Sequence, residues 1–124
     1  MEIVRQKEFV NQYHYDARNL EWEKENGTPE TAVEVKFKLV EKNMEKTQTT
    51  IVSTLQFIIV QEDFVVSGMI SQLNLIKDRI INQPNEFTQE EAKDLASPLL
   101  DILKRLTYEV SEIALDRAGL NLEF

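Results

Sequence analysis

The sequence predicts an α+β protein with two layers: a four-stranded antiparallel sheet, followed by a short helix and one long C-terminal helix. Residues up to about 76 are rich in β-branched side chains and in alternating apolar and polar positions, which is typical of strands. After Pro84 the apolar residues recur with the period of a helix. One apolar helix face and one apolar sheet face bury each other in a two-layer arrangement. We therefore expect a single domain over residues 1–124, with strands over about 2–76, helices over about 89–117 and a docked tail over 119–124.

The composition limits where the protein works and what it binds. A chain of 124 residues is long enough for one buried core, and its net charge of −8 disfavours binding to a phosphate backbone. The sequence has no cysteine, which excludes disulfides and fits a reducing compartment. The first nine residues lack the pattern of a signal peptide, and the longest wholly apolar run, residues 57–60, is far shorter than the roughly 20 residues of a membrane helix. We expect a soluble, cytoplasmic protein that binds neither nucleic acid nor membranes.

The first strand is predicted over residues 9–15, where aromatic and other side chains alternate. One set of alternate positions in this strand consists of Phe9, Asn11, Tyr13 and Tyr15. Residues 16–31 are predicted to form a long polar connection, because they contain a glycine, a proline and only one large apolar pair, Leu20 and Trp22.

The next three strands form the clearest part of the sheet. Residues 33–39 alternate apolar and charged side chains, which predicts a strand with one buried and one wet face. Residues 49–60 and 64–75 predict two further strands, and the three residues between them require an antiparallel hairpin. Gly68, inside the last strand, indicates a bulge or a close approach of another backbone.

The helical part of the chain carries clear capping signals. Thr88 and Glu91 form a capping box that opens a short helix, which we expect to end before Pro98. Ser97 then caps a second, long helix with Pro98 at its first position, and Gly119 is placed to end it. The apolar side chains on one face of the long helix are Leu99, Leu100, Ile102, Leu103, Leu106, Val110, Ile113 and Ala114.

No group of residues indicates an enzyme. His14 is the only histidine, and it lies within a predicted strand without other metal ligands at a suitable spacing. Ser67 and Gly68 lack the rest of the G-x-S-x-G pattern of a nucleophile elbow. The three glycines of the chain are too far apart to form a phosphate-binding loop. We expect no catalytic, metal or cofactor site.

The last third of the chain resembles the SecB family of export chaperones. In that family a proline opens the long helix and an LNL-containing segment follows it; here these marks are Pro98 and the run Gly119-Leu120-Asn121-Leu122. The connection before the second strand of SecB also carries a tryptophan, as Trp22 does here. Over residues 1–124 the chain is similar, more closely still, to a family of short uncharacterised proteins of Gram-positive bacteria that is grouped with the SecB-like fold.

This resemblance implies a four-stranded antiparallel sheet with the long helix on one face, and assembly into dimers or tetramers whose helices lie between the sheets. It also implies that the tail, with Leu120, Leu122 and Phe124, is docked and buried. SecB continues beyond its LNL segment into a helix that borders its peptide groove, whereas this chain stops at Phe124. We therefore expect part of that groove, and one contact with the export motor, to be absent or rebuilt.

Two functions follow as hypotheses. The first is a non-enzymatic, SecB-like oligomer that binds exposed apolar segments of non-native polypeptides. Its candidate surface is made of aromatic residues that could instead fill the core: Phe9, Tyr13, Tyr15 and Trp22. The alternative is a structural or adaptor oligomer with one dedicated protein partner and no general chaperone activity. In both cases Tyr108 and Leu115 are the candidate oligomer interface, because they lie seven residues apart on the back of the long helix.

Overall fold

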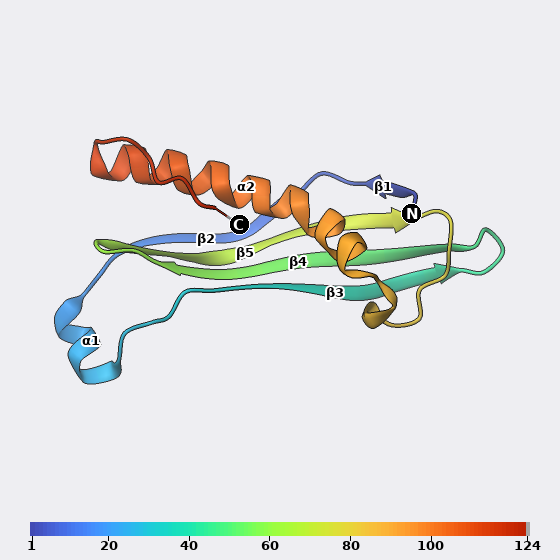
Figure 1. Ribbon diagram of the computed structural model, residues 1–124, viewed down its shortest axis with the longest axis horizontal. Helices are drawn as coiled ribbons and strands as arrows, with labels where there is room; N and C mark the ends of the chain where they lie inside the picture. Colours follow the sequence, from blue (N-terminus) through green and yellow to red (C-terminus); the bar gives the residue numbers. More distant parts are fainter. Residues whose placement is uncertain (124) are drawn as a thin grey trace.

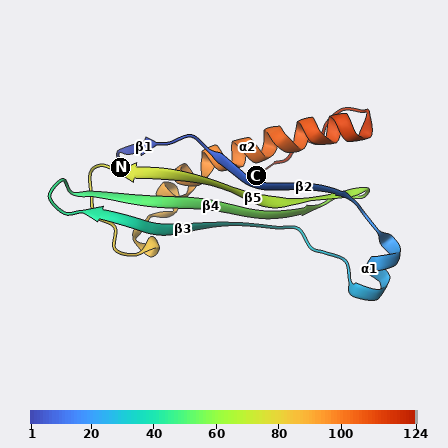
Figure 2. The same ribbon diagram turned by 180° about the vertical axis from the view of Figure 1, so that it is seen from behind.

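The computed structural model of the chain describes residues 1–123. In chain order its elements are β1 (Ile3–Arg5), β2 (Phe9–Ala17), α1 (Leu20–Asn26), β3 (Ala32–Asn43), β4 (Gln48–Val60), β5 (Phe64–Ile76), η1 (Pro84–Glu86) and α2 (Gln89–Leu115). The strands form one antiparallel sheet, and α2 lies across one of its faces (Figure 1). Seen from behind, the other face has no helix over it within residues 1–123 (Figure 2). The predicted fold class, α+β in two layers, is confirmed.

The sheet has one more strand than the sequence predicts. Its order is β1-β5-β4-β3, and β2 also pairs with β5. Ile3 of β1 lies opposite Ile76, at one end of β5, whereas β2 lies opposite the part of β5 that runs from Ser71 back to Phe64. The short strand β1 and the longer strand β2 therefore follow one another along the same edge of the sheet.

A bulge in β2 places the residues before it on the opposite sheet faces from those that the sequence predicts. The register shifts between Val10 and Gln12, so Asn11 is an extra residue in the ladder. Val10 lies opposite Ile70, which is buried under α2, and Phe9 therefore points to the uncovered face. The expectation that Phe9 shares a face with Tyr13 is wrong, because the extra residue breaks the two-residue alternation on which it depends.

Gly68 lies where the bulge crosses β5. A Cβ atom built on Gly68 would lie 2.0 Å from the carbonyl oxygen of Gln12, which is closer than any two such atoms can approach. The same Cβ would lie 3.1 Å from the ring of Phe57. The predicted close approach of a backbone at Gly68 is confirmed, and glycine is required there for steric reasons.

A short helix, α1, replaces part of the predicted connection. Asn19 caps it, since its side chain accepts a hydrogen bond from the backbone N–H of Trp22 at 3.0 Å. Arg18 fixes α1 to the rest of the fold: it donates two hydrogen bonds to the buried carboxylate of Glu23, at 2.7 and 3.2 Å, and one to the backbone oxygen of Gln61 at 3.1 Å. These contacts bind α1 to the turn between β4 and β5.

The two predicted helices are a single helix. The capping box of Thr88 and Glu91 opens α2 as expected, but the helix continues through Pro98 to Leu115. Proline cannot donate to the carbonyl of Asp94, four residues earlier. Arg5 of β1 does so instead, because its Nη2 lies 2.8 Å from the Asp94 backbone oxygen. The predicted break before Pro98 is therefore wrong, and a side chain from the opposite end of the chain explains why.

The buried apolar side chains form two clusters under α2. The larger one contains Leu55, Phe57, Ile59, Phe64, Val66, Ile70, Leu99 and Leu103, and the smaller one contains Ile51, Ile76, Ile81, Phe87 and Leu95. A buried polar band lies between them along β4 and β5. In this band Asn74 donates to the hydroxyl of Ser53 at 3.1 Å, and Gln72 donates to the backbone oxygen of Gln6 at 2.8 Å.

After α2 the chain turns back along the helix (Figure 1). The helix ends at Leu115, and Asp116 adopts a left-handed conformation (φ 49°, ψ 47°), so the expected stop at Gly119 is wrong. Gly119 instead lies against the helix: a Cβ there would be 2.2 Å from the Tyr108 carbonyl oxygen. Leu120 and Leu122 pack against the larger apolar cluster. The third residue of the expected hook, Phe124, lies outside the described residues.

Candidate polypeptide-binding surfaces

The two flanks of α2 have different surroundings. Each residue of an ideal helix is rotated by about 100° from the one before it, so four residues of α2 lie along one side: Lys104, Tyr108, Ser111 and Leu115. The tail runs along this side. We call it the tail flank. Ile102, Leu106, Val110 and Ile113 lie along the opposite side, and we call this row the open flank. Both flanks carry apolar side chains. Within residues 1–123 the tail covers the first, whereas on the second Ile102 and Leu106 pack partly against the larger apolar cluster and Ile113 is exposed.

A groove runs between the open flank and the beginning of β2. It has a volume of about 410 Å³, and its apolar lining consists of Val10, Ile102 and Leu106. Charged side chains of both signs form its rim: Lys7, Glu8, Arg105 and Glu109. Ile113 extends the apolar row toward the end of α2, and 77% of this residue is exposed. Ile113 does not line the groove, so apolar surface continues beyond the groove along α2. The two basic and two acidic side chains of the groove give it no net charge.

The groove also borders a free strand edge. Among the described residues β2 pairs only with β5, so the backbone groups on its other side have no strand partner. Such an edge can accept an added strand from an extended polypeptide, because its N–H and C=O groups already have the spacing of a ladder. The groove and the edge together offer apolar contacts and backbone hydrogen bonds to the same extended segment.

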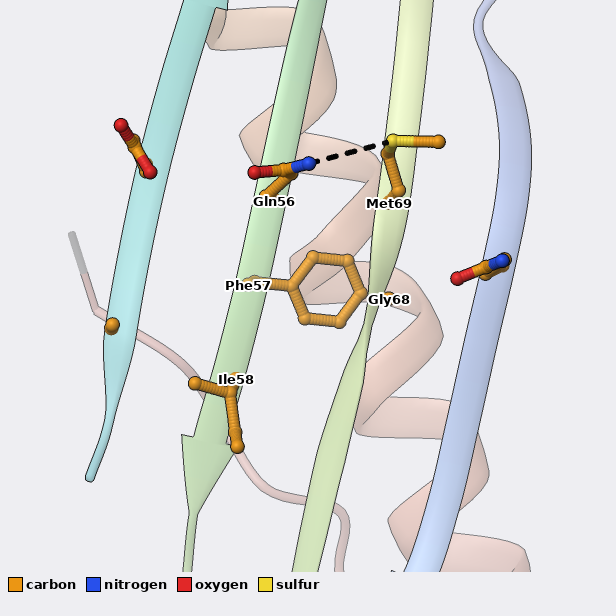
Figure 3. Close-up of a pocket in the computed structure, with 8 residues that line it drawn as sticks. Gln56, Phe57, Ile58, Gly68 and Met69 are labelled. Carbon is orange, nitrogen blue, oxygen red and sulfur yellow. Dashed lines mark hydrogen bonds between the residues drawn. The ribbon is translucent and has the colours of Figure 1, made fainter. Parts of the chain in front are cut away.

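A second hollow lies on the uncovered face of the sheet, around Gly68 (Figure 3). It is shallow, with a volume of about 280 Å³, and mixes polar and apolar side chains. Gln56 and Met69 lie beside each other at its border, with the amide nitrogen 3.9 Å from the sulfur. Within residues 1–123 no group of three histidine, cysteine or acidic side chains is placed to hold a metal ion. The described part of the chain also contains no helix long and apolar enough to span a membrane.

The structure separates the four aromatic residues that the sequence suggests for polypeptide binding. Phe9 is 64% exposed on the uncovered face, and Trp22 is 55% exposed on α1. Tyr13 and Tyr15 instead lie half-buried between sheet and helix. The ring of Tyr13 lies 5.9 Å from that of Phe57, and Tyr15 stacks on Phe64 at 5.0 Å. These four residues do not form one surface, because the bulge turns Phe9 away and the core takes the two tyrosines.

Tyr13 also joins a buried polar group beneath the tail. Its hydroxyl donates to Oγ1 of Thr107 at 3.2 Å, and burial raises the pKa of this hydroxyl above its ordinary value. Ser111 follows one turn after Thr107 and donates to its backbone oxygen at 2.6 Å. Ser111 Oγ in turn accepts the N–H of Leu120 at 2.8 Å. The tail is thus hydrogen-bonded to the helix through one serine hydroxyl.

The two residues suggested for an oligomer interface lie on the same flank of α2 but differ in burial. Leu115 packs against the larger apolar cluster, whereas Tyr108 is 36% exposed. The exposed apolar residue of the last turns is Ile113, which the sequence places on the buried face of the helix. That placement is wrong because Thr107 and Ser111 take part of the buried face, and hydrophobic periodicity does not predict buried hydroxyls. The open flank is recognised as a surface from the exposure of Ile113 in the structure and not from the sequence pattern.

Comparison with known proteins places the chain among proteins of unknown function. The family described as "Protein of unknown function (DUF1149)" matches residues 1–124. A crystal structure of a protein of unknown function from Streptococcus agalactiae is 61% identical, covers 100% of this chain and 98% of that one, and superposes with a TM-score of 0.98. A SecB-like chaperone of Mycobacterium tuberculosis, solved in complex with a ChAD peptide from the HigA1 antitoxin, is 12% identical over 98% of this chain and 90% of that one, with a TM-score of 0.52. No curated protein sequence matches the chain. The last of these structures shows the fold alone, and it confirms that the fold is SecB-like.

Proposed function

The chain belongs to the DUF1149 family, and from this premise we propose that it binds extended apolar segments of non-native polypeptides in the groove between the open flank of α2 and β2. The observation that carries the proposal is the open flank itself. Ile113 is 77% exposed and continues a row of three half-buried aliphatic side chains beside a free strand edge. A row of this kind on a water-exposed surface is typical of an interaction site.

The chemistry of the groove favours a polypeptide over a small molecule. Aliphatic side chains line its floor, and charges of both signs lie on its rim, so it can accept apolar side chains of varied sequence. A small-molecule site would instead enclose its ligand and present a few convergent polar groups. We therefore treat the protein as non-enzymatic, and its composition without cysteine supports a place in the cytoplasm.

The SecB-like neighbour supports the same class of ligand. That chaperone of Mycobacterium tuberculosis was solved with a peptide from another protein bound to it. A shared fold does not carry function by itself, so the support comes from the combination of the fold with an exposed apolar groove. Phe9 and Trp22, both exposed, offer further apolar contacts away from the groove.

The experiment is an aggregation assay with a matched pair of variants. A chemically denatured test protein is diluted into buffer with the wild-type protein, and we expect light scattering to rise more slowly than without it. Ile113→Glu should weaken this protection because it places a charge in the apolar row. Ala114→Glu adds the same charge at an exposed position of the same helical turn and should leave protection unchanged. Equal protection by both variants would remove the exposed end of the apolar row from the proposal, and no protection by the wild type at several-fold excess would remove the function.

A second candidate function is that of an oligomeric adaptor. A second copy of the chain, in a dimer or tetramer, would bury the exposed side chain of Ile113 if it covered the open flank. Light scattering in solution distinguishes the two. An oligomeric wild type whose mass falls on Ile113→Glu, without any protection of the test protein, would favour the adaptor with one dedicated partner.

A further inference from the structure

The tail, residues 116–123, is attached to the fold by few directional contacts. Leu120 donates its backbone N–H to Ser111 Oγ at 2.8 Å. Arg117 forms an ion pair with Asp63 at 3.3 Å, in which both side chains are more than half exposed, and such pairs contribute little. No backbone–backbone hydrogen bond joins the tail to the sheet or to α2 among the described residues. Two leucine side chains on the larger apolar cluster therefore provide most of the attachment.

The surface beneath the tail has the features of a site for an extended chain. Ser111 is 2% exposed and holds its hydroxyl in place by donating to the Thr107 backbone oxygen. The oxygen of this hydroxyl then accepts the backbone N–H of Leu120. The residue before it, Gly119, lies so close to the Tyr108 carbonyl oxygen that a Cβ atom there would be 2.2 Å away, so a segment seated in this way needs a glycine before the bonded N–H. The apolar cluster beside it takes two side chains that lie two residues apart, as they do along any extended segment.

We propose that the tail is a displaceable strap over a second polypeptide-binding site, and that a segment with a glycine followed by two aliphatic side chains two residues apart, as in Gly119-Leu120-Asn121-Leu122, can take its place. The inference rests on the proposed function, since it supposes that the protein meets such segments. In the resting state the tail provides the amide for Ser111 and the two leucines for the apolar cluster. A client segment makes the same contacts once the strap is released, so the tail lowers the affinity of the site for weakly apolar chains.

The occupant is identified by the tail itself. The described chain shows an extended segment with leucines at positions 120 and 122 seated on this site, with its backbone bonded to Ser111. Competition by a covalently attached segment reduces the apparent affinity of a free ligand by the fraction of molecules in which the strap is released. Weakening the strap should therefore strengthen the binding of a free peptide by the same factor.

The test uses the full chain and a synthetic, fluorescein-labelled peptide with the sequence of residues 117–124. The double variant Leu120→Asp/Leu122→Asp releases the strap. The double variant Ala118→Asp/Asn121→Asp adds the same charge at two exposed tail positions and serves as the control. We expect fluorescence anisotropy to show that the released variant binds the peptide at least about tenfold more tightly than the wild type and the control. Equal affinity for all three proteins would overturn the inference.

A second measurement on the wild type decides the matter if the released variant does not fold. At a saturating concentration of the peptide, hydrogen exchange at the Leu120 amide should become faster, while amides of β4 should not change. An unchanged rate at Leu120 would overturn the inference. If the wild type protects the denatured test protein but Leu120 does not respond, the proposed function stands and the strap fails. If Leu120 responds but no protection occurs, the strap stands and the proposed function fails.

Discussion

Replacing Arg5 with methionine removes the side chain that satisfies the Asp94 carbonyl oxygen, and we expect a clear loss of stability. The guanidinium of Arg5 lies 2.8 Å from this oxygen and 3.4 Å from the Asp94 carboxylate. A hydrogen bond that involves a charged group contributes about 1.5–3 kcal/mol, whereas an exposed ion pair contributes about 0–1 kcal/mol. Because Arg5 is partly exposed, we expect a loss near the lower end, about 1.5–2 kcal/mol.

The reason for this loss can be isolated with Pro98→Ala. Alanine at position 98 has a backbone N–H that can donate to the Asp94 oxygen through the ordinary helical bond. In that background the Arg5→Met change should cost only the exposed ion pair, at most about 1 kcal/mol. The two changes should therefore be coupled by about 0.5 kcal/mol or more, which is measurable from urea unfolding of the four proteins.

The control is Asp94→Asn, which removes the charged carboxylate but keeps the backbone carbonyl. It should cost less than about 1 kcal/mol, because only the exposed ion pair is lost. If Arg5→Met costs the same with proline and with alanine at position 98, the guanidinium does not replace the missing helical hydrogen bond, and the explanation of the continuous helix is refuted.

Three further predictions concern other parts of the fold. Arg79 and the Thr88 backbone lower the pKa of Glu91 to about 2, so the stability that this carboxylate contributes is present above its unfolded pKa of about 4.3 and is lost as the pH falls toward 2. The Glu91→Gln variant should lose less stability over that interval; equal urea midpoint shifts would contradict this. Gly68→Ala should lower stability by about 2 kcal/mol or more, because the methyl group would lie 2.0 Å from the Gln12 carbonyl oxygen, and an unchanged melting temperature would show that the strands adjust freely. Deletion of residues 120–124 removes two half-buried leucines, each worth about 1.5–3 kcal/mol when fully buried, and should lower the melting temperature by several degrees; a superimposable melting curve would show that the tail adds nothing.

The sequence predicts those parts of the fold that depend on neighbouring residues. The strand β3 follows from two-residue alternation, and β4 follows from its many β-branched residues. The hairpin that joins β4 to β5 follows from a link of three residues. The capping box at Thr88 and the steric role of Gly68 are also local signals. Each of these features depends on residues that are close together in the sequence.

The features that the sequence does not predict depend on contacts between distant residues. Pro98 stays inside a helix because Arg5 lies beside Asp94. The short helix α1 forms where Arg18 reaches the β4–β5 turn, a contact that no periodicity encodes.

The same holds for the candidate site. Ile113 belongs to an apolar helix face in the sequence, but it is exposed because buried hydroxyls beneath the tail take part of that face. The open flank can be recognised only after the position of the tail is known.

The buried polar band under α2 has a consequence for how the molecule opens. Ser53, Gln72 and Asn74 separate an apolar cluster of eight buried residues from one of five, so the interior is not one continuous apolar unit. A hydrogen bond in the band contributes only about 0.5–1.5 kcal/mol of net free energy, less than the burial of a large apolar side chain contributes to either cluster. We therefore expect amides around the smaller cluster to exchange with solvent faster than those around the larger one, although β4, β5 and α2 run through both. α2 spans both clusters. It passes from the smaller to the larger at Pro98, where the helical hydrogen bond to the Asp94 carbonyl oxygen is missing.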